Sequence, residues 1–514
     1  MTMTKKTSKS ASGRKSGYKN KNTKINNKRK TAKSAGADIE YSRNGSNLRN
    51  FETNVVMAFF VGIFVLMMVY LVYFSVAKAP DIIDNPYNKR VDNQDVKVVR
   101  GDILAGDEVT VLATTKKDEG GKEYRYYPFG NVFSHVIGLK SEKTGIEGQA
   151  NFQLLQHNSG FFEQIIKDIT GQKKIGNSVV TTLDAKLQQA AYDALGSNKG
   201  AVVVMEPSTG KVLAMVSKPD FNPNESDEYY KEWLTYSSAD SVLINRATQG
   251  LYAPGSTFKI VTLLEYFMEN DNYSGYSFNC EGSVTVDGGT TIPCNNKAVH
   301  GEETLKSAFA NSCNGAFSTI GLKLDISKLQ YLCDGLMFNK DIPIGLESVK
   351  SSFVLDAAST VSDIQETAIG QGKTMISPMH NLMITACIAN KGVMMKPYFI
   401  EKIKTADGEI VEEIEPEALS NAVPENYAAQ AAEYMRAVVT EGTATALRYA
   451  DYGVAGKTGT AQYGTEGLTH SWFVGFAPYD NPQVAICVIR EGSENAGRSA
   501  QYIARDVLDS YFGE

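Results

Sequence analysis

Three short motifs follow one another along the chain and together hold the residue types needed for nucleophilic catalysis by a serine. They are Ser256-Thr-Phe-Lys259, Ser312-Cys-Asn314 and Lys457-Thr-Gly459. A serine hydroxyl is a poor nucleophile unless a base lies within hydrogen-bond reach. A lysine acts as that base only when neutral, and burial or neighbouring positive charge lowers a lysine pKa by several units. The motifs therefore predict Ser256 as nucleophile, Lys259 as its base, and Lys457 as the neighbouring charge that also attracts an anionic substrate.

The setting of the first motif separates it from copies elsewhere, such as Ser12-x-x-Lys15 in the N-terminal tail. Ser256 follows Pro254-Gly255 and opens the apolar run 258–267, which is typical of a helix N-terminus. Side chains at positions i and i+3 share one face of a helix, so Ser256 and Lys259 are expected to lie together. A serine before a helix is more often an N-cap than a nucleophile, so its role depends on the order of all three motifs.

The second and third motifs fall at the ends of predicted elements. Ser312-Cys-Asn314 marks the junction between two helical patterns, where Ser312 and Asn314 could also serve as helix caps. Lys457 lies on a segment of small residues, which two predicted strands at 471–477 and 484–489 follow. The competing interpretation of Lys457 is a solvated strand residue.

The elements that must position these motifs indicate an α+β fold. Residues 201–205 and 211–216 flank a Pro-Ser-Thr-Gly turn and predict a β-hairpin. With the strand of Lys457 and the two strands after it, the hairpin predicts a five-stranded antiparallel sheet. Residues 225–450 are expected to be mostly helical, and the amphipathic segment 500–511 is expected to pack on the sheet.

The N-terminal part predicts a single membrane anchor. The first fifty residues hold fourteen Lys/Arg against Asp38 and Glu40, a balance of +12, so the remainder of the chain carries −18. Residues 55–76 hold no charged side chain, and a helix of this length spans about 33 Å, enough to cross a bilayer. The positive-inside rule predicts a cytoplasmic tail at 1–54, a signal-anchor helix at 55–76 and an extracytoplasmic remainder. A cleaved signal peptide competes, but both the basic and the apolar stretch are longer than such signals have.

Neither nucleic acid nor a metal ion is expected as a partner. The basic tail next to an apolar span fits a solvated segment near anionic lipid headgroups better than a nucleic-acid site. The five histidines are scattered and no Cys-x-x-Cys occurs, so no metal site and no cofactor are predicted. Cys280 and Cys294 bracket a glycine-rich stretch and could equally form a disulfide or stay as free thiols. The cysteine inside the second motif, Cys313, has no predicted role.

The motifs and their surroundings resemble class B penicillin-binding proteins. The matching stretches include Asn245-Arg246, His300-Gly301, Ile369-Gly-Gln-Gly372 and His470-Ser-Trp-Phe473, and further upstream Arg100-Gly101 and Gly145-Ile-Glu147. The resemblance covers nearly everything after residue 80. It implies a strand-rich pedestal domain at 81–175 and a transpeptidase domain at 176–514, with a five-stranded sheet and a helical subdomain.

The same resemblance implies a peptidoglycan D,D-transpeptidase that binds penicillin covalently. The resemblance implies that Ser256 attacks the D-Ala-D-Ala peptide bond while Lys259 accepts the proton of the Ser256 hydroxyl. Ser312 then passes a proton to the departing D-alanine. Asn314 holds the amide backbone of the substrate. The substrate carboxylate then faces Lys457 and the residues after it, Thr458, Gly459 and Thr460. His300, Gln371 and Trp472 are expected to line the cleft or to support packing. For His470, both a contact with the substrate and a structural role stay open.

Other functions share these motifs and stay open at this point. A β-lactamase must also activate a water, and no carboxylate motif dedicated to that task is visible; a D,D-carboxypeptidase usually ends in an amphipathic anchor. A β-lactam sensor or a scaffold protein is the non-enzymatic alternative. The expected partners are stem peptides, β-lactams as inhibitors, the membrane, and a membrane glycosyltransferase of the SEDS type, because the chain shows no glycosyltransferase region of its own.

Overall fold

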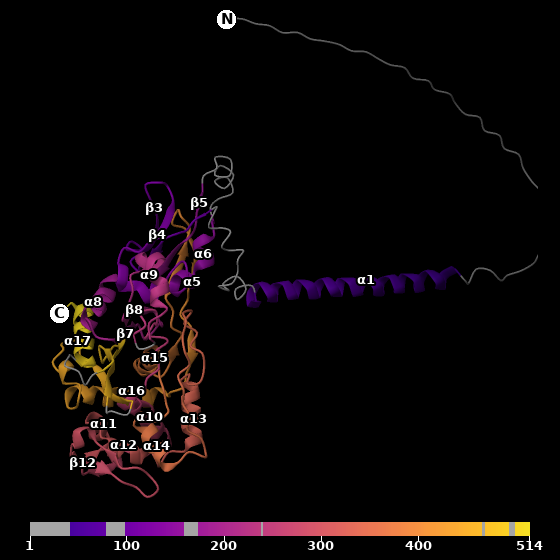
Figure 1. The fold of residues 1–514 in the computed structure, drawn as a ribbon. Coiled ribbons are helices and arrows are strands. Elements are labelled where there is room, and N and C mark those ends of the chain that lie inside the picture. The colour runs from indigo at the N-terminus through magenta and orange to yellow at the C-terminus, as the bar shows by residue number, and fades with distance from the viewer. Residues whose placement is uncertain are drawn as a thin grey trace, which may run out of the picture. The chain divides into compact units, whose positions relative to one another are not determined.

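The computed structural model describes residues 42–78, 98–158, 173–237, 240–464, 468–492 and 499–513. The chain forms two units, residues 1–77 and residues 78–514 (Figure 1). The second unit mixes helices with antiparallel sheets, which confirms the predicted α+β class.

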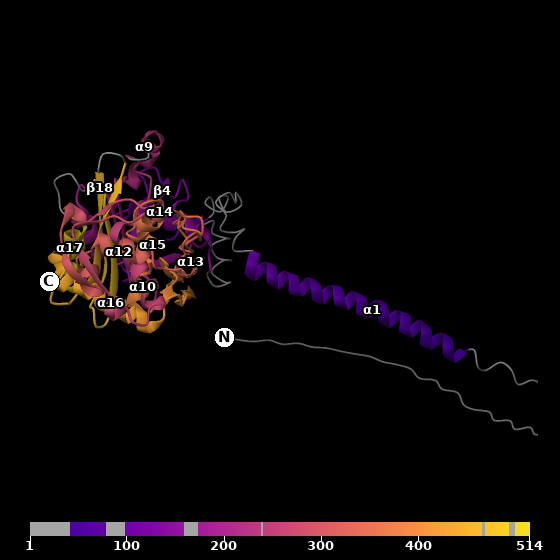
Figure 2. The same cartoon turned by 90° about the horizontal axis from the view of Figure 1, so that it is seen from below.

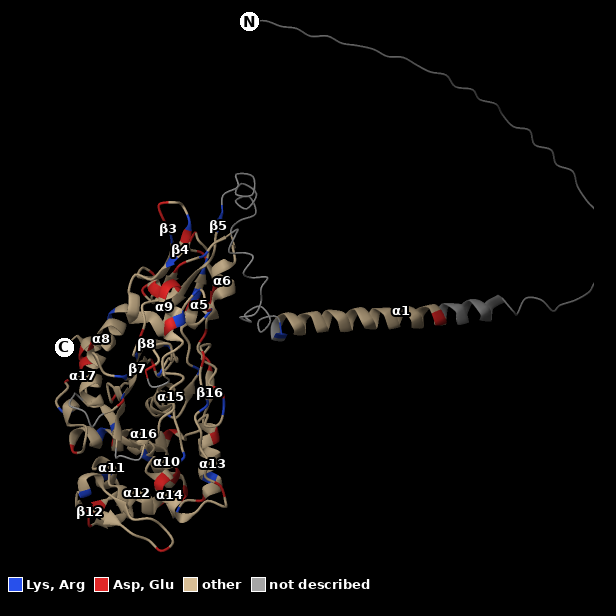
Figure 3. Cartoon of the chain, viewed as in Figure 1, with Lys and Arg blue, Asp and Glu red and all other residues tan. Residues whose placement is uncertain are grey.

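The described part of the first unit is one long helix with an apolar span. Helix α1 (Ser42–Tyr73) continues into a π-helical turn at Phe74–Lys78, and its apolar span is Phe51–Tyr73, with exposed side chains and a mean hydropathy of 2.9. Figure 3 shows this span without charged residues beyond its first turn. The span of 23 residues is about 35 Å long, sufficient for a bilayer. The predicted anchor at 55–76 therefore lies inside a longer helix, since the flanking polar residues continue the helical backbone.

The second unit is built on the predicted five-stranded antiparallel sheet, with strand order β17-β18-β19-β7-β8. Every residue of β19 is buried, and so is every residue of β7, because helices cover both faces of the sheet. The five strands are β7 (Gly200–Met205), β8 (Val212–Lys218), β17 (Ala455–Tyr463), β18 (Leu468–Ala477) and β19 (Val484–Arg490).

Helices α8 (Ala185–Leu195) and α17 (Ala500–Phe512) pack together on the sheet, which confirms the expected position of the C-terminal helix. Helix α15 (Pro378–Ala389) also contacts β7, β18 and β19, and all but its last residue are buried. It begins with the hydroxyl of Ser377 as N-cap and Pro378 in its first turn. Figure 2 shows β18 between α17 and α15, so the sheet is the middle of three layers.

The helical subdomain lies at the end of the body away from β3 and β4 (Figure 1). Its helices are α10 (Lys259–Glu269), α11 (Leu305–Ala310), α12 (Asn314–Gly321), α13 (Ile326–Gly335), α14 (Val361–Ala368) and α16 (Glu425–Thr440). Four short strands accompany them: β9 (Ser277–Cys280), β10 (Ser283–Val284), β11 (Ile292–Pro293) and β12 (Gly301–Thr304). Residues 225–450 are therefore helical with short strands between the helices.

A six-stranded sheet, β15-β14-β6-β2-β3-β4, forms the pedestal part. Its strands are β2 (Ile103–Leu104), β3 (Val111–Lys117), β4 (Glu123–Tyr126), β6 (Ser178–Thr181), β14 (Ile400–Lys404) and β15 (Ile410–Glu413). Two of them come from residues 400–413, so this sheet continues across the predicted boundary at residue 175. The remaining short elements are α4 (Ser134–Ile137), α5 (Gly145–Gln149), α6 (Asn151–Leu155), α9 (Ser226–Trp233), β1 (Val98–Val99), β5 (Lys174–Ile175), β13 (Met394–Met395) and β16 (Ala418–Ser420).

A buried ion-pair network holds the pedestal part together. The fully buried carboxylate of Glu147 accepts hydrogen bonds from Arg100 Nε at 2.7 Å and from Arg125 Nε at 2.6 Å. The two guanidinium groups hold the pKa of Glu147 below its usual value, although burial acts in the opposite direction. Removal of this one carboxylate would leave two buried cations without their shared partner.

Candidate active site

The three motifs meet at one cleft of about 1130 Å³. Its lining includes six of the predicted site residues: Ser256, Ser312, Asn314, Thr458, Gly459 and Thr460. The other two, Lys259 and Lys457, are completely buried and reach the hydroxyl of Ser312 from the protein interior. The structure therefore brings together all eight residues that the motifs predicted.

Ser256 lies in a tight turn that is pressed against the sheet. The 3-10 turn Gly255–Thr257 precedes α10, and the backbone N–H of Gly255 donates to the carbonyl oxygen of Gly370 at 2.7 Å. Gly255 has φ +55°, and a Cβ atom there would lie 2.5 Å from the carbonyl oxygen of Thr460 on β17. Only glycine allows both the left-handed backbone and this close approach, which brings the Ser256 turn beside β17.

Lys259 is the buried amine nearest the second motif. Its Nζ donates to the carbonyl oxygen of Ser312 at 2.7 Å, to Ser312 Oγ at 3.2 Å and to Asn314 Oδ1 at 2.7 Å. Within the described residues no hydrogen bond joins it to Ser256 Oγ; catalytic hydrogen bonds are often long before substrate binds. Burial lowers the pKa of Lys259 to about 7, while the thiols of Cys313 and Cys294 act against that shift. About half of the Lys259 amine is then neutral near pH 7, the state that a base requires.

Lys457 approaches the same hydroxyl from β17. Its Nζ donates to Ser312 Oγ at 2.9 Å and to the carbonyl oxygen of Thr458 at 3.1 Å. Burial lowers the pKa of Lys457 well below its ordinary value, and the charge of Lys259 lowers it further. Two amines therefore share Ser312 Oγ, and a proton on one of them disfavours a proton on the other. This arrangement is suited to passing a proton between the lysines through the Ser312 hydroxyl.

The second motif adopts a strained turn that directs its polar side chains toward the lysines. Ser312 has φ +57°, and α12 begins directly after Cys313, whose Sγ accepts the backbone N–H of Ala316 at 3.4 Å. The helix cap is thus Cys313. Ser312 and Asn314, which the sequence also allowed as caps, instead contact the buried amines. Asn314 Nδ2 additionally donates to the carbonyl oxygen of Pro293 at 2.8 Å.

Strand β17 supplies the third side of the cleft. It pairs with β18 over its whole length, with Gly459 opposite Trp472 and Thr460 opposite Ser471. The side chains of Thr458 and Thr460 are two positions apart, so they share the face of β17 that lines the cleft. Thr458 Oγ1 forms a hydrogen bond of 2.5 Å with Thr443 Oγ1, a contact that the sequence did not predict because no local pattern marks Thr443.

The supporting residues largely take the positions that the sequence suggested. Gln371 lines the cleft, and its Nε2 donates to the carbonyl oxygen of Thr460 at 3.3 Å. Trp472 is buried, with Nε1 donating to the carbonyl oxygen of Ala253 at 3.1 Å. His470, the undecided residue, stacks on Tyr463 with ring centroids 3.9 Å apart, which indicates a packing role.

The cysteines form a group that the sequence did not reveal. Cys280 and Cys294 are free thiols with their sulfur atoms 3.6 Å apart, so the structure holds no disulfide between them. Cys313 and His300 lie in the same group, and His300 also lines the cleft. Their separations along the chain, 14, 6 and 13 residues, match no common metal-binding spacing, and only the fold places them together.

Comparison with known proteins agrees with this site. Residues 200–509 match the penicillin binding protein transpeptidase domain, and residues 100–179 match the penicillin binding protein A dimerisation domain. The first match alone covers more than half of the chain. The chain belongs to the penicillin-binding protein transpeptidase family. The predicted family is therefore confirmed, whereas the predicted domain boundaries stay predictions.

Related proteins and solved structures cover almost the whole second unit. The chain is 31% identical over 462 residues to the peptidoglycan D,D-transpeptidase PbpA of Mycolicibacterium smegmatis, which covers 84% of this chain and 92% of the relative. An imipenem acyl-enzyme complex of penicillin-binding protein A from M. tuberculosis gives a TM-score of 0.74 at 28% identity, over 82% of this chain and 100% of that one. The D,D-transpeptidase domain of a peptidoglycan glycosyltransferase from Eggerthella lenta gives a TM-score of 0.72 at 33% identity, over 81% and 99%.

Proposed function

We propose that this protein is a peptidoglycan D,D-transpeptidase, which crosslinks stem peptides through a serine acyl-enzyme in bacterial cell-wall synthesis. The observation that carries the proposal is the shared contact of two buried amines with Ser312 Oγ, in the cleft that Ser256 lines. The relatives named as peptidoglycan D,D-transpeptidases and the acyl-enzyme structure of penicillin-binding protein A support the same conclusion.

The acylation step follows from these contacts. Ser256 Oγ attacks the carbonyl carbon of the D-Ala-D-Ala bond while neutral Lys259 accepts the hydroxyl proton. The C–N bond then breaks, and Ser312, linked to Lys259 and Lys457, delivers a proton to the departing D-alanine amine. The acyl group stays on Ser256 as an ester, which the amine of an acceptor stem peptide attacks with the proton transfers reversed.

The substrate is held by groups on both sides of the nucleophile. We assign the terminal carboxylate of the donor peptide to Lys457, Thr458, Gly459 and Thr460, since Thr458 and Thr460 present hydroxyl donors from one face of β17. The second amide hydrogen of Asn314 Nδ2 is assigned to the peptide backbone. The backbone N–H groups of Ser256 and Thr460 are assigned to the oxyanion, and loss of one such donor costs about 10²–10³ in rate.

The protein is anchored in the membrane by α1, and we assign its N-terminus to the cytoplasm. The excess of fourteen Lys/Arg over two acidic residues in the first fifty positions supports this orientation. The catalytic unit then faces the cell wall, where a SEDS-type glycosyltransferase would supply glycan.

Protease added outside spheroplasts should remove the catalytic unit and spare an epitope at residue 1. Loss of the epitope with survival of the catalytic unit would invert the orientation.

Two incubations separate this function from its alternatives. In the first, the full chain in detergent is mixed with nascent glycan carrying pentapeptide stems, and crosslinked dimers and free D-alanine are measured, with Ser256→Ala as the control. We expect dimers that depend on Ser256, whereas free D-alanine without dimers identifies a carboxypeptidase. In the second, the full chain is mixed with penicillin, and rapid release of hydrolysed penicillin identifies a β-lactamase. Absence of dimers, free D-alanine and hydrolysed penicillin, with tight binding of a glycosyltransferase, identifies a scaffold protein.

A further inference from the structure

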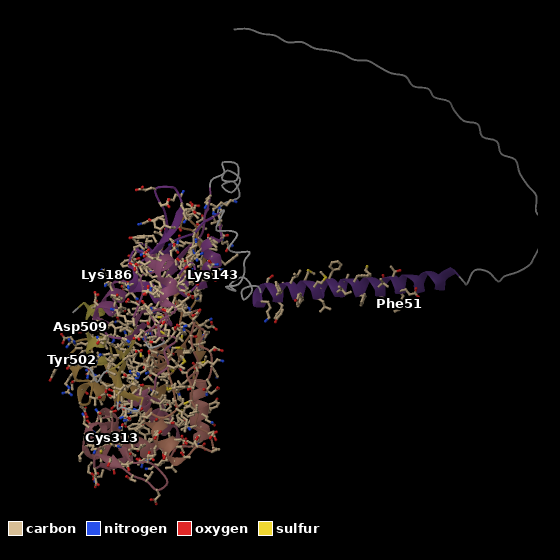
Figure 4. All side chains as sticks on the ribbon, viewed as in Figure 1. Phe51, Lys143, Lys186, Cys313, Tyr502 and Asp509 are labelled. Atoms are coloured by element: carbon tan, nitrogen blue, oxygen red, sulfur yellow. The ribbon has the colours of Figure 1, made fainter. Side chains whose placement is uncertain are left out.

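Four side chains gather directly behind the second motif. The sulfur atoms of Cys280, Cys294 and Cys313 and a ring nitrogen of His300 all lie within 4.8 Å of one another. The three cysteines are buried and His300 is half-buried. Figure 4 labels Cys313 within the catalytic unit. Among the described residues this is the only group of histidine, cysteine or acidic side chains with such an arrangement.

Three of the six separations between these atoms are close to the edges of a metal tetrahedron, and all six are within 4.8 Å. The sulfur of Cys294 lies 3.6 Å from that of Cys280 and 3.8 Å from that of Cys313, and the sulfur of Cys280 lies 3.3 Å from His300 Nδ1. Zinc–sulfur bonds of about 2.3 Å and zinc–nitrogen bonds of about 2.0–2.1 Å at tetrahedral angles give edges of about 3.8 Å between sulfurs and about 3.6 Å between sulfur and nitrogen. An ion therefore fits at the centre with only small adjustments.

The local fold holds three of the ligands independently of any ion. Strand β9 ends at Cys280, which pairs with Gly301 at the start of β12, so His300 arrives beside Cys280. The hairpin β10–β11 returns the chain, and the backbone N–H of Cys294 donates to the carbonyl oxygen of Gly282 at 2.9 Å. Short strands and a tight hairpin that present ligands in this way are frequent in small metal sites.

A backbone donor points at one of the sulfur atoms, as donors do in thiolate metal sites. The Sγ of Cys313 accepts the N–H of Ala316 at 3.4 Å. This donor lies in the first turn of α12, where N–H groups have no partner within the helix. Hydrogen bonds of this kind orient metal ligands and stabilise the negative charge of a thiolate.

We propose that Cys280, Cys294, His300 and Cys313 bind one zinc ion as a structural Cys₃His site. Three soft sulfur ligands and one imidazole in tetrahedral arrangement select zinc among the common divalent ions. Four protein ligands leave no open position, so the ion stabilises structure and takes no part in the reaction. Binding converts the three thiols to thiolates and releases their three protons to solvent.

The zinc site fixes the second motif from two sides. Cys313 stands between Ser312 and Asn314, so its bond to zinc holds the strained turn that directs both side chains toward the lysines. Pro293, whose carbonyl accepts Asn314 Nδ2, directly precedes Cys294. Loss of zinc should therefore slow acylation by penicillin, by about 10²-fold if the second motif shifts by about 1 Å.

The test measures metal content before activity. The full chain is purified in detergent with reductant and without chelator, and its zinc is measured by mass spectrometry. We expect about one zinc ion per chain. Cys294→Ala should lose the ion. The matched control Cys387→Ala removes an equally buried thiol from α15, outside the group, and should retain it.

A second measurement needs no variant. Zinc is removed from the wild-type protein with a chelator and replaced by Co²⁺, and we expect the thiolate-to-cobalt absorption of a tetrahedral sulfur site. Three results would overturn the proposal: reduced wild-type protein that binds neither zinc nor Co²⁺, equal zinc in Cys294→Ala and wild type, or an intact mass two hydrogens lighter that maps to a disulfide within the group.

Discussion

The acylation rate should depend on pH through Lys259, with a midpoint near pH 7. Burial lowers the pKa of this amine to about 7. Only the neutral amine accepts the proton of Ser256, so the rate rises as pH increases through the pKa and levels off above it. The neutral fraction is about 10% at pH 6 and about 1% at pH 5, so the rate should fall about tenfold per pH unit below the midpoint.

Burial sets the position of that midpoint, and the thiols of Cys313 and Cys294 act against the shift. Lys457 on β17 shares Ser312 Oγ with Lys259, but burial and the charge of Lys259 hold the pKa of Lys457 well below its ordinary value, so Lys457 is not the group that lowers the pKa of Lys259. Lys457→Gln should therefore leave the midpoint near pH 7, whatever it does to the maximum rate. Lys306→Gln, which alters an exposed pair with Glu433, should leave the midpoint unchanged.

The assay is the second-order rate of acylation by a fluorescent penicillin between pH 5 and pH 9, with fold integrity followed by circular dichroism at each pH. A rate that is flat across this range would refute the role of Lys259 as base. A rate that still rises at pH 9 would show that the amine keeps the pKa of an exposed lysine, near 10.4, and would refute the effect of burial.

Three further predictions concern particular contacts. Ser312→Ala removes the hydroxyl that both lysines share and should slow acylation about 10²–10⁴-fold in rapid-mixing assays with little change in thermal stability; an unchanged rate would remove Ser312 from the relay. Gly255→Ala places a Cβ 2.5 Å from the carbonyl oxygen of Thr460, at φ +55°, and should abolish penicillin labelling on gels, whereas normal labelling would show that the turn tolerates a side chain. Glu147→Gln leaves two buried arginines without their carboxylate and should lower the free energy of unfolding by about 3–5 kcal/mol in denaturant titrations. The exposed control Glu433→Gln should cost less than about 1 kcal/mol, and equal costs for the two variants would contradict the buried network.

The sequence predicted the catalytic sheet well because its signals are local. The predicted hairpin strands at 201–205 and 211–216 and the strands after Lys457 show apolar runs bounded by turn residues, and they form the predicted five-stranded sheet. The order of the three motifs likewise predicted residues that the fold brings together at one cleft, since each motif is contained within three or four positions.

The features that escaped prediction depend on contacts between distant residues. Strands β14 and β15 join the pedestal sheet although more than 200 residues separate them from β6, and no local pattern reports such pairing. The contact of Thr443 with Thr458 likewise joins two separate segments. The Cys313 cap is local, but cysteine is not among the residues that mark a helix N-terminus in a sequence. The residues of the cysteine group lie at or beside the ends of short strands and at a helix cap, so their grouping becomes visible only in three dimensions.

The central claim, that Ser256 is the nucleophile of a penicillin-binding transpeptidase, is tested most directly by locating the acylated residue. The full chain is reacted with penicillin, digested, and its peptides are analysed by tandem mass spectrometry, with Ser256→Ala in parallel. We expect one penicilloyl group, on Ser256 alone, and no adduct in the variant. An adduct on another residue such as Ser312, or labelling that persists in Ser256→Ala, would contradict the account.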